Sequence, residues 1–203
     1  MGVTRAASLW HASHVMRELA PGLLAAAPSL RCPFFHHTVV LLIDHGDDGS
    51  FGFVLNKEAP LDFRGVAEEL GLAVENDRVF DVPVLRGGPV SPETGWIVFD
   101  PDGAPKMPKD VLRVAGGLAL TASVDMLHAM ASGEVPQRAL LTLGYSGWSP
   151  GQLEDEMREG SWIPIDLDPA LIFELPIADR WRIALESLGI DPGRVTSRIV
   201  PQA

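Results

Sequence analysis

The chain has 203 residues, of which 46% are hydrophobic, and its 16 Lys and Arg against 27 Asp and Glu give a formal net charge of -11. This length allows one substantial hydrophobic core without a stabilising metal or disulfide. A field of this sign repels phosphate backbones unless basic side chains gather on one face, so direct nucleic-acid binding is not expected.

Cysteine usage and the N-terminal segment bear on the compartment. Cys32 is the only cysteine, so no internal disulfide can form, which fits a reducing environment. Histidines and charged residues interrupt every apolar run of residues 1–18, and no apolar stretch approaches the roughly 20 residues that span a bilayer. We therefore expect a cytoplasmic protein without a membrane span, with an extension over 1–18, one domain over 19–191 and a tail over 192–203.

The first half of the chain predicts a β-hairpin and a helix. Strands are predicted over 23–27 and 38–44, and the second is apolar throughout, as is typical of a strand covered on both faces. After the turn-forming HGDDGS, residues 51–56 are expected to return antiparallel to 38–44. An amphipathic helix over 62–70 is predicted to end at Gly71.

The second half predicts short strands and helices in mixed order. Strands are expected over 79–85, 95–100, 111–115, 138–145 and 162–165, and helices over 123–133 and 178–188, with a helical turn at 168–169. Since tight turns join several strands and strict βαβ alternation is absent, the pattern favours the α+β class in one compact domain.

The clearest helix start lies after residue 148. Ser149 is the predicted N-cap, Pro150 fits the first helical position, and Gln152 would complete a capping box. We expect this helix to end at Gly160.

The GYSGW segment at 144–148 resembles a nucleophile elbow without matching it. An elbow requires G-x-S-x-G, whereas Trp148 occupies the fifth position, and no HGGG loop lies upstream of Ser146. The favoured interpretation is a tight turn that needs Gly144 and Gly147 for its backbone, with Trp148 packed over it.

Two other segments offer anion-binding or nucleophilic chemistry. Arg86, Gly87 and Gly88 combine a guanidinium with backbone N–H groups, as an anion nest would, although a structural turn is favoured because no phosphate-loop motif follows. Cys32 follows Arg31, and a neighbouring cation lowers a thiol pKa, so a reactive thiol is one interpretation. A small buried apolar residue is the other.

Metal-binding patterns are weak. His36 and His37 would point to opposite faces of a strand, which suits one ligand but no chelating pair. His11 and His14 could chelate on a helix, but no third ligand lies nearby. The acidic turn at 44–49 departs from a calcium loop at its third and last ligand positions. No metal and no cofactor are predicted.

Five segments, taken in order, resemble the AlgH/YqgE family of bacterial proteins, also called DUF179 or UPF0301. They are LAPGLLAAAPSL at 19–30, CPFFHHTVVLLIDHGDDGSFGFVLNK at 32–57, LRGGPVSPETGWIVFD at 85–100, LTASVDMLHAMASG at 120–133 and LGYSGWSPGQLEDEMREGSWIP at 143–164. The resemblance covers about residues 19–191, and the last segment is the most specific. The family commonly reads D-P-x-F where this chain has Cys32, so no role of that acid is carried over.

The resemblance implies a compact α+β domain with a strongly curved, partly barrel-like mixed sheet and helices packed around it. It implies no established activity. Some members are described as transcriptional regulators, but this sequence shows no helix-turn-helix and has the wrong net charge for one.

Three functions stay open. The first is a non-enzymatic regulatory or adaptor domain that binds an unknown protein or small molecule. Its expected contacts are Arg86, Gly87, Gly88, Tyr145, Gly147, Trp148 and Gln152. Trp96, Trp148 and Trp162 would form an exposed anchor patch, which fails if the indoles are buried. The others are a DNA regulator and an enzyme that uses Ser146 or Cys32, which requires a histidine within hydrogen-bond distance.

Overall fold

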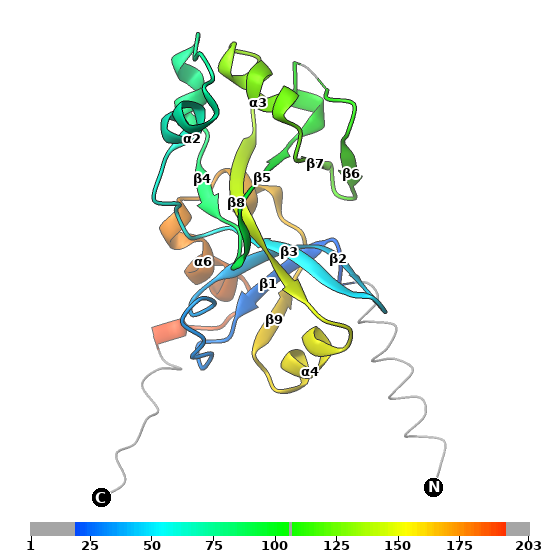
Figure 1. Ribbon diagram of the computed structural model, residues 1–203. Coiled ribbons are helices and arrows are strands. Elements are labelled where there is room, and N and C mark those ends of the chain that lie inside the picture. Colours follow the sequence, from blue (N-terminus) through cyan, green and yellow to red (C-terminus); the bar gives the residue numbers. More distant parts are fainter. Residues whose placement is uncertain (1–18, 106, 194–203) are drawn as a thin grey trace, which may run out of the picture.

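One curved sheet organises the chain in the computed structural model, which describes residues 19–105 and 107–193 (Figure 1). Its strands are β1 (Gly22–Ala26), β2 (Val39–Gly46), β3 (Gly49–Val54), β4 (Val84–Arg86), β5 (Val90–Phe99), β6 (Leu112–Val114), β7 (Leu118–Thr121), β8 (Ala139–Trp148) and β9 (Trp162–Ile165). Their spatial order is β6-β7-β5-β8-β3-β2-β1-β9, and β4 pairs with β8 off this path. The predicted extension over 1–18 and most of the predicted tail lie outside the described residues.

The sheet is mixed. Only β4 and β8 run parallel among the described strand pairs, while the other pairs are antiparallel. The predicted α+β class with a curved mixed sheet is therefore confirmed.

Strand β8 joins the two halves of the sheet, and Figure 1 shows it passing from the upper strands to the lower ones. Its first residues pair with β5 and β4, and Ser146–Trp148 pair with Ser50–Gly52 of β3. Gly144, with a φ of 69°, lies between these two regions in the left-handed conformation that glycine adopts most readily.

The predicted hairpin is confirmed as β2 and β3, and its apolar strand is buried on both faces. Val39, Leu41 and Ile43 belong to a core cluster that includes residues of α6 (Arg180–Ser187). Val40 and Leu42, which point the other way, belong to a second cluster with Trp148. The alternation explains why no polar residue interrupts this strand until Asp44.

Helices cover both halves of the sheet. The elements are α2 (Phe63–Leu70), α3 (Val124–Ala131), α4 (Gln152–Arg158), α5 (Pro169–Phe173) and α6. Helices α2 and α3 pack with β5, β7 and β8 in a third core cluster. The predicted helix is confirmed as α2: its N-cap is Asp62, whose Oδ1 accepts a hydrogen bond from Gly65 N at 3.0 Å, and its C-cap is Gly71. No helix within the described ranges is long and apolar enough to cross a membrane.

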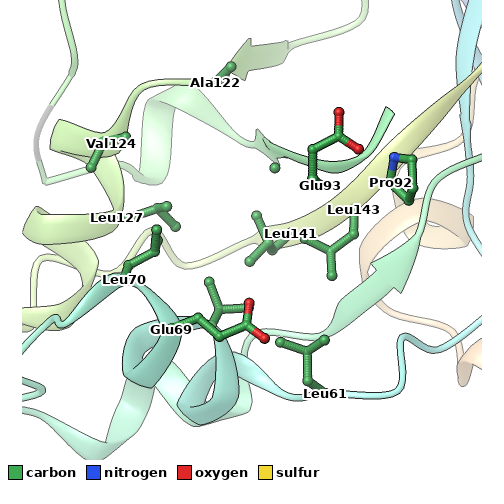
Figure 2. A pocket seen from close by; sticks show the side chains of 12 residues that line it. Leu61, Glu69, Leu70, Pro92, Glu93, Ala122, Val124, Leu127, Leu141 and Leu143 are labelled. Carbon is green, nitrogen blue, oxygen red and sulfur yellow. The ribbon is translucent and has the colours of Figure 1, made fainter. Parts of the chain in front are cut away.

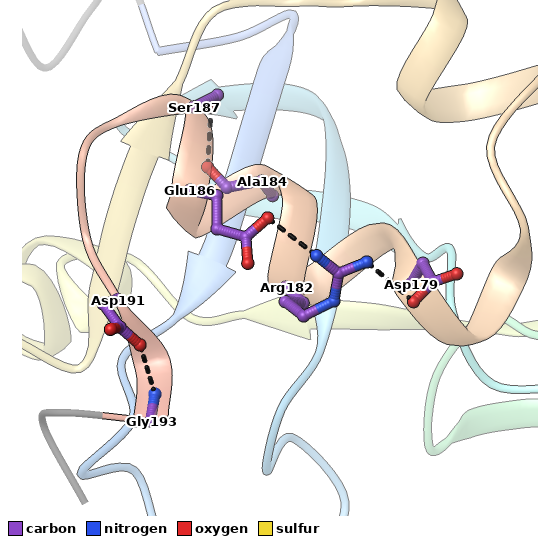
Figure 3. Close-up of polar contacts among 7 residues, drawn as sticks. All are labelled: Asp179, Arg182, Ala184, Glu186, Ser187, Asp191 and Gly193. Carbon is purple, nitrogen blue, oxygen red and sulfur yellow. Dashed lines mark hydrogen bonds and ion pairs between the residues drawn. The ribbon is translucent and has the colours of Figure 1, made fainter.

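Two arginines of α6 make different kinds of contact. Arg180 is 2% exposed, and it donates to the carbonyls of Leu55 at 2.6 Å and Leu175 at 3.1 Å, while burial lowers its pKa to about 10. On the outer surface, Arg182 pairs with Asp179 at 3.0 Å and Glu186 at 2.7 Å (Figure 3). The buried arginine therefore connects α6 to the end of β3.

The predicted strand over 79–85 is largely wrong. Asp77–Asp81 form a 3₁₀ helix, and β4 takes only the last part of the predicted range. Asn76 accounts for the difference, because its side chain accepts a hydrogen bond from Arg78 N at 3.0 Å and so starts a turn. Val79 is buried under α2 and α3 rather than paired in the sheet.

The predicted start of α4 is shifted. Gly151, with a φ of 78°, is the N-cap, and Ser149 makes no side-chain capping bond. One half of the predicted capping box does form, because Gln152 Oε1 accepts a hydrogen bond from Ser149 N at 3.0 Å. The glycine adds a turn before the helix that the sequence pattern did not indicate.

The loop after β4 crosses β8 at backbone contact. A Cβ on Gly88 would lie 1.9 Å from the carbonyl carbon of Tyr145, and one on Gly87 would lie 2.4 Å from Gly144 O. Gly87 N donates to Leu143 O at 2.9 Å, and Gly87 O accepts from Val54 N at 2.8 Å. These glycines are required because the two backbones leave no room for a side chain.

We expect Gly88→Ala to lower the free energy of unfolding by about 3 kcal/mol or more, since β8 cannot move without disturbing both halves of the sheet. Urea unfolding followed by far-UV circular dichroism measures the change. Gly46→Ala is the matched control, because its Cβ would meet nothing within 4 Å. A Gly88→Ala protein with the unfolding midpoint of the parent would contradict this account of the crossing.

Candidate functional site

The GYSGW segment, predicted to be a tight turn, is instead the end of strand β8, and its Trp148 packs with Trp162 in a buried unit, the tryptophan corner. Trp148 and Trp162 are 5% and 3% exposed. Their indole N–H groups donate to the same oxygen, Glu156 Oε2, at 3.0 and 2.7 Å. The Phe35 ring lies 6.0 Å from Trp148 and 5.4 Å from Trp162, measured between ring centroids. The prediction that these indoles form an exposed anchor patch is therefore wrong.

Trp96, the third member of that patch, belongs to a different aromatic cluster. Its ring centroid lies 5.6 Å from Phe51 and 5.9 Å from Phe53, and Tyr145 joins the cluster 5.1 Å from Phe51. Its Nε1 is buried and has no hydrogen-bond partner among the described residues. The predicted residues around 145–148 are thus divided between two sides of the sheet.

Gln152 and Gly147 have structural contacts as well. Gln152 Nε2 donates to Glu156 Oε1 at 2.8 Å, which steadies the carboxylate that receives both indoles. Gly147 pairs with Phe51 in the ladder between β8 and β3. Both residues are exposed, and their part in binding stays a prediction.

The candidate nucleophiles have no histidine partner in the described part of the chain. Ser146 is fully buried, and its Oγ donates to Gly87 O at 3.1 Å. Cys32 is half-buried, and no imidazole is hydrogen-bonded to its sulfur among the described side chains. The condition set for an enzyme at either residue is not met.

A serine–histidine–carboxylate series that the sequence pattern did not reveal lies elsewhere. His45 Nδ1 is 2.8 Å from Ser50 Oγ, and Nε2 is 3.9 Å from Glu154 Oε1. The distance from His45 Nε2 to Glu154 Oε1 is too long for a hydrogen bond, and the His45 side chain is only 3% exposed. These residues connect the β2–β3 hairpin to α4, which is a structural role.

The adjacent histidines lie in a turn, so the prediction that they point to opposite faces of a strand is wrong. His37 has a φ of 55°, its ring stacks on His36 at 3.6 Å, and its other face stacks on Trp181 at 3.9 Å. No group of three or more His, Cys, Asp or Glu side chains that could hold a metal occurs within the two described ranges. His11 and His14 lie outside the described residues.

Two cations lie against the Phe34 ring. The backbone N–H of Arg86, at the end of β4, donates to Lys57 O at 2.7 Å, which holds Lys57, in the loop after β3, beside Arg86. Lys57 Nζ lies 4.9 Å and Arg86 Cζ 5.6 Å from the centre of the Phe34 ring, and Lys57 also donates to Phe34 O. Burial and the Arg86 cation lower the pKa of Lys57, whereas Cys32 acts in the opposite direction. We call Phe34, Lys57, Arg86 and Cys32 the basic cluster.

The basic cluster brings together two residues singled out in the sequence, Arg86 and Cys32, and adds Lys57, which was missed. The anion nest, the less favoured of the two interpretations of Arg86–Gly88, loses one donor, because the N–H of Gly87 is already bonded to Leu143 O. The side chain of Arg86 is exposed here and that of Lys57 is half-buried, whereas Gly87 and Gly88 are buried. Strand pairing between residues distant in sequence created the juxtaposition, and no sequence motif signals it.

A groove of about 270 Å³ lies between α2, α3 and the strands β5 and β8 (Figure 2). Its lining is mainly aliphatic and comprises Leu61, Val66, Glu69, Leu70, Pro92, Glu93, Gly95, Ala122, Val124, Leu127, Leu141 and Leu143. Leu70 and Val124 at its rim are 49% and 52% exposed. We call it the α2–α3 groove, and the sequence pattern did not predict it.

Two carboxylates border the α2–α3 groove. Glu69 belongs to the last turn of α2, and the pairing register of β5 with β8 shifts between Val90 and Gly95, which carries Glu93 out of the ladder. Both glutamates are exposed, and neither has an ion-pair partner among the described residues. The groove therefore combines an apolar floor with unpaired negative charge.

Comparison with known proteins agrees with the resemblance seen in the sequence. A family model described as AlgH-like, DUF179, matches residues 23–193. A UPF0301 protein of Anaeromyxobacter dehalogenans is 41% identical over 179 residues, covering 86% of this chain and 90% of the relative. One from Paraburkholderia phymatum is 40% identical over 173 residues, covering 85% and 90%.

Solved structures show the same fold. The solution structure of the AlgH protein from Pseudomonas aeruginosa is similar with a TM-score of 0.72 and 32% identity, covering 91% of this chain and 96% of that one. A crystal structure of a Corynebacterium diphtheriae protein has a TM-score of 0.65 at 22% identity, covering 83% and 86%, and supports the fold alone.

We expect Glu156→Ala to lower the free energy of unfolding by about 2–3 kcal/mol, because the N–H groups of Trp148 and Trp162 lose their shared acceptor. Urea unfolding measures the loss. Glu159→Ala, at the exposed end of α4, removes the same charge and serves as control. Equal midpoints for the two variants would show that the shared carboxylate is not what stabilises the corner.

Acidification should destabilise the chain through His37. Burial, then His36, then Arg31 lower its pKa below the ordinary 6.5, so below that pH the unfolded chain binds a proton that the folded chain resists. The melting temperature should therefore fall between about pH 7.5 and pH 5.5.

His37→Asn should reduce this pH dependence, since asparagine tolerates a positive φ and does not titrate. His128→Asn, on the exposed side of α3, is the control. Thermal melts followed by circular dichroism measure how the melting temperature changes with pH. An unchanged pH dependence in His37→Asn would refute the role of His37.

Proposed function

This chain belongs to the AlgH-like family, and we propose that it is a non-enzymatic adaptor domain that binds a partner protein in the α2–α3 groove. The observation that carries the proposal is an aliphatic groove bordered by two carboxylates without ion-pair partners in the described part of the chain.

The apolar part of the groove favours a protein ligand. Leu70 and Val124 are large side chains left about half exposed on neighbouring helices, and Leu127, Leu141 and Leu143 continue the apolar surface inward. Contiguous exposed apolar surface of this kind is typical of interaction sites, whereas scattered exposed leucines are not. An aliphatic side chain inserted between Leu70 and Val124 would remove the exposed parts of both from water.

The charge at the rim defines the partner's chemistry. Glu69 and Glu93 lie on opposite borders of the groove, on α2 and β5 (Figure 2). A segment that carries an aliphatic residue flanked by Lys or Arg would satisfy both features. The net charge of -11 would also steer such a basic segment toward the protein.

Other features of the chain make an enzyme and a DNA regulator less favourable than an adaptor. Ser146 is buried and bonded to a backbone carbonyl, and Cys32 has no imidazole bonded to it among the described residues. The negative charge of the whole chain opposes contact with a phosphate backbone. The proposal places the adaptor in the bacterial cytoplasm, where a lone cysteine stays reduced.

A labelled amphipathic peptide of alternating leucine and lysine tests the groove. We expect fluorescence anisotropy to detect binding, and Glu93→Lys to weaken it about threefold to tenfold, because an attractive contact becomes repulsive. Glu159→Lys makes the same change of charge on α4, away from the groove, and should leave most of the affinity intact.

Two outcomes would overturn the proposal. Equal weakening by Glu93→Lys and Glu159→Lys would mean that the peptide senses only the overall charge. Unchanged binding after Leu70→Ser combined with Val124→Ser would mean that the apolar rim is not the contact. A peptide of leucine and glutamate is the probe control and should not bind.

A further inference from the structure

We propose that the basic cluster is a second, separate site, which binds the oxyanion group of a small molecule, a phosphate or a carboxylate, between Lys57 and Arg86. The cluster lies at the end of β4 and in the loops before β2 and after β3, whereas the groove lies between α2 and α3. The two proposals share no side chain, so each can fail without the other.

Backbone bonds hold the two cations together. Arg86 N donates to Lys57 O at 2.7 Å, and the next residue, Gly87, is bonded to Leu143 of β8 through its N–H and to Val54 of β3 through its carbonyl. Lys57 Nζ is further anchored on the carbonyl of Phe34. The chain therefore cannot relieve the repulsion between the cations by moving the strands apart.

The positive charge at this place is not neutralised by the described part of the protein. No carboxylate lies within ion-pair distance of Lys57 or Arg86 among the described residues. The Phe34 ring faces both cations, and such contacts stabilise a charge without cancelling it. The lowered pKa of Lys57 has the Arg86 cation as its second cause after burial, as expected for an unbalanced positive site.

The chemistry of the two side chains fits an oxyanion. The exposed guanidinium of Arg86 offers parallel N–H donors that match two oxygens of a carboxylate or phosphate, and Lys57 contributes a compact charge beside them. Phe34 supplies an apolar wall. A small ligand is favoured over a nucleic acid, because the rest of this strongly acidic chain repels a long polyanion.

Thermal melting and calorimetry with inorganic phosphate, pyrophosphate, acetate and succinate test the site, each at the ionic strength of a sodium chloride reference. We expect at least one oxyanion to raise the melting temperature above that reference. Lys57→Gln and Arg86→Gln should each weaken its apparent affinity about tenfold, the loss of one charge-assisted hydrogen bond. Whether the phosphates or the carboxylates act identifies the ligand class.

Arg113→Gln provides the matched control, since it removes one exposed cation from β6. It should retain the affinity of the parent chain. No stabilisation beyond chloride by any of the four anions, or an equal loss in Arg113→Gln, would overturn the proposal. Circular dichroism spectra confirm that each variant is folded before its affinity is interpreted.

Discussion

The close crossing of the Gly87–Gly88 backbone over β8 is the constraint on which the rest of the structure depends. A side chain at Gly88 would lie 1.9 Å from Tyr145, so the two segments meet as bare backbone. From this crossing, β8 pairs upward with β4 and β5 and downward with β3. The upper and lower parts of the sheet therefore cannot shift independently of each other.

Both proposed binding surfaces are built on this crossing. Immediately before it, Arg86 is bonded through its backbone to Lys57, which creates the basic cluster. Beyond it, the bulged β5 turns Glu93 toward the groove, whose floor includes Leu141 and Leu143 of β8. Gly87 and Gly88 thus have a structural role, and they affect the proposed binding surfaces only by positioning the neighbouring side chains.

Local signals explain what was predicted correctly. Asp62 and Gly71 bound α2 because a side-chain acceptor and a left-handed residue act within a few positions of the helix ends. The hairpin of β2 and β3 follows from an apolar strand, a polar turn and a returning strand. The resemblance of separate segments to one family indicated the curved mixed sheet, which the structure confirms.

The sequence by itself determined the α+β class, the hairpin, most helices and the family, because each rests on short-range patterns or on matching segments. Only the tertiary structure decided that Trp148 and Trp162 are buried on one carboxylate and that Lys57 meets Arg86. It also formed the groove from elements that are far apart in the chain. These features depend on which distant strands pair, and hydrophobic periodicity carries no information about that choice.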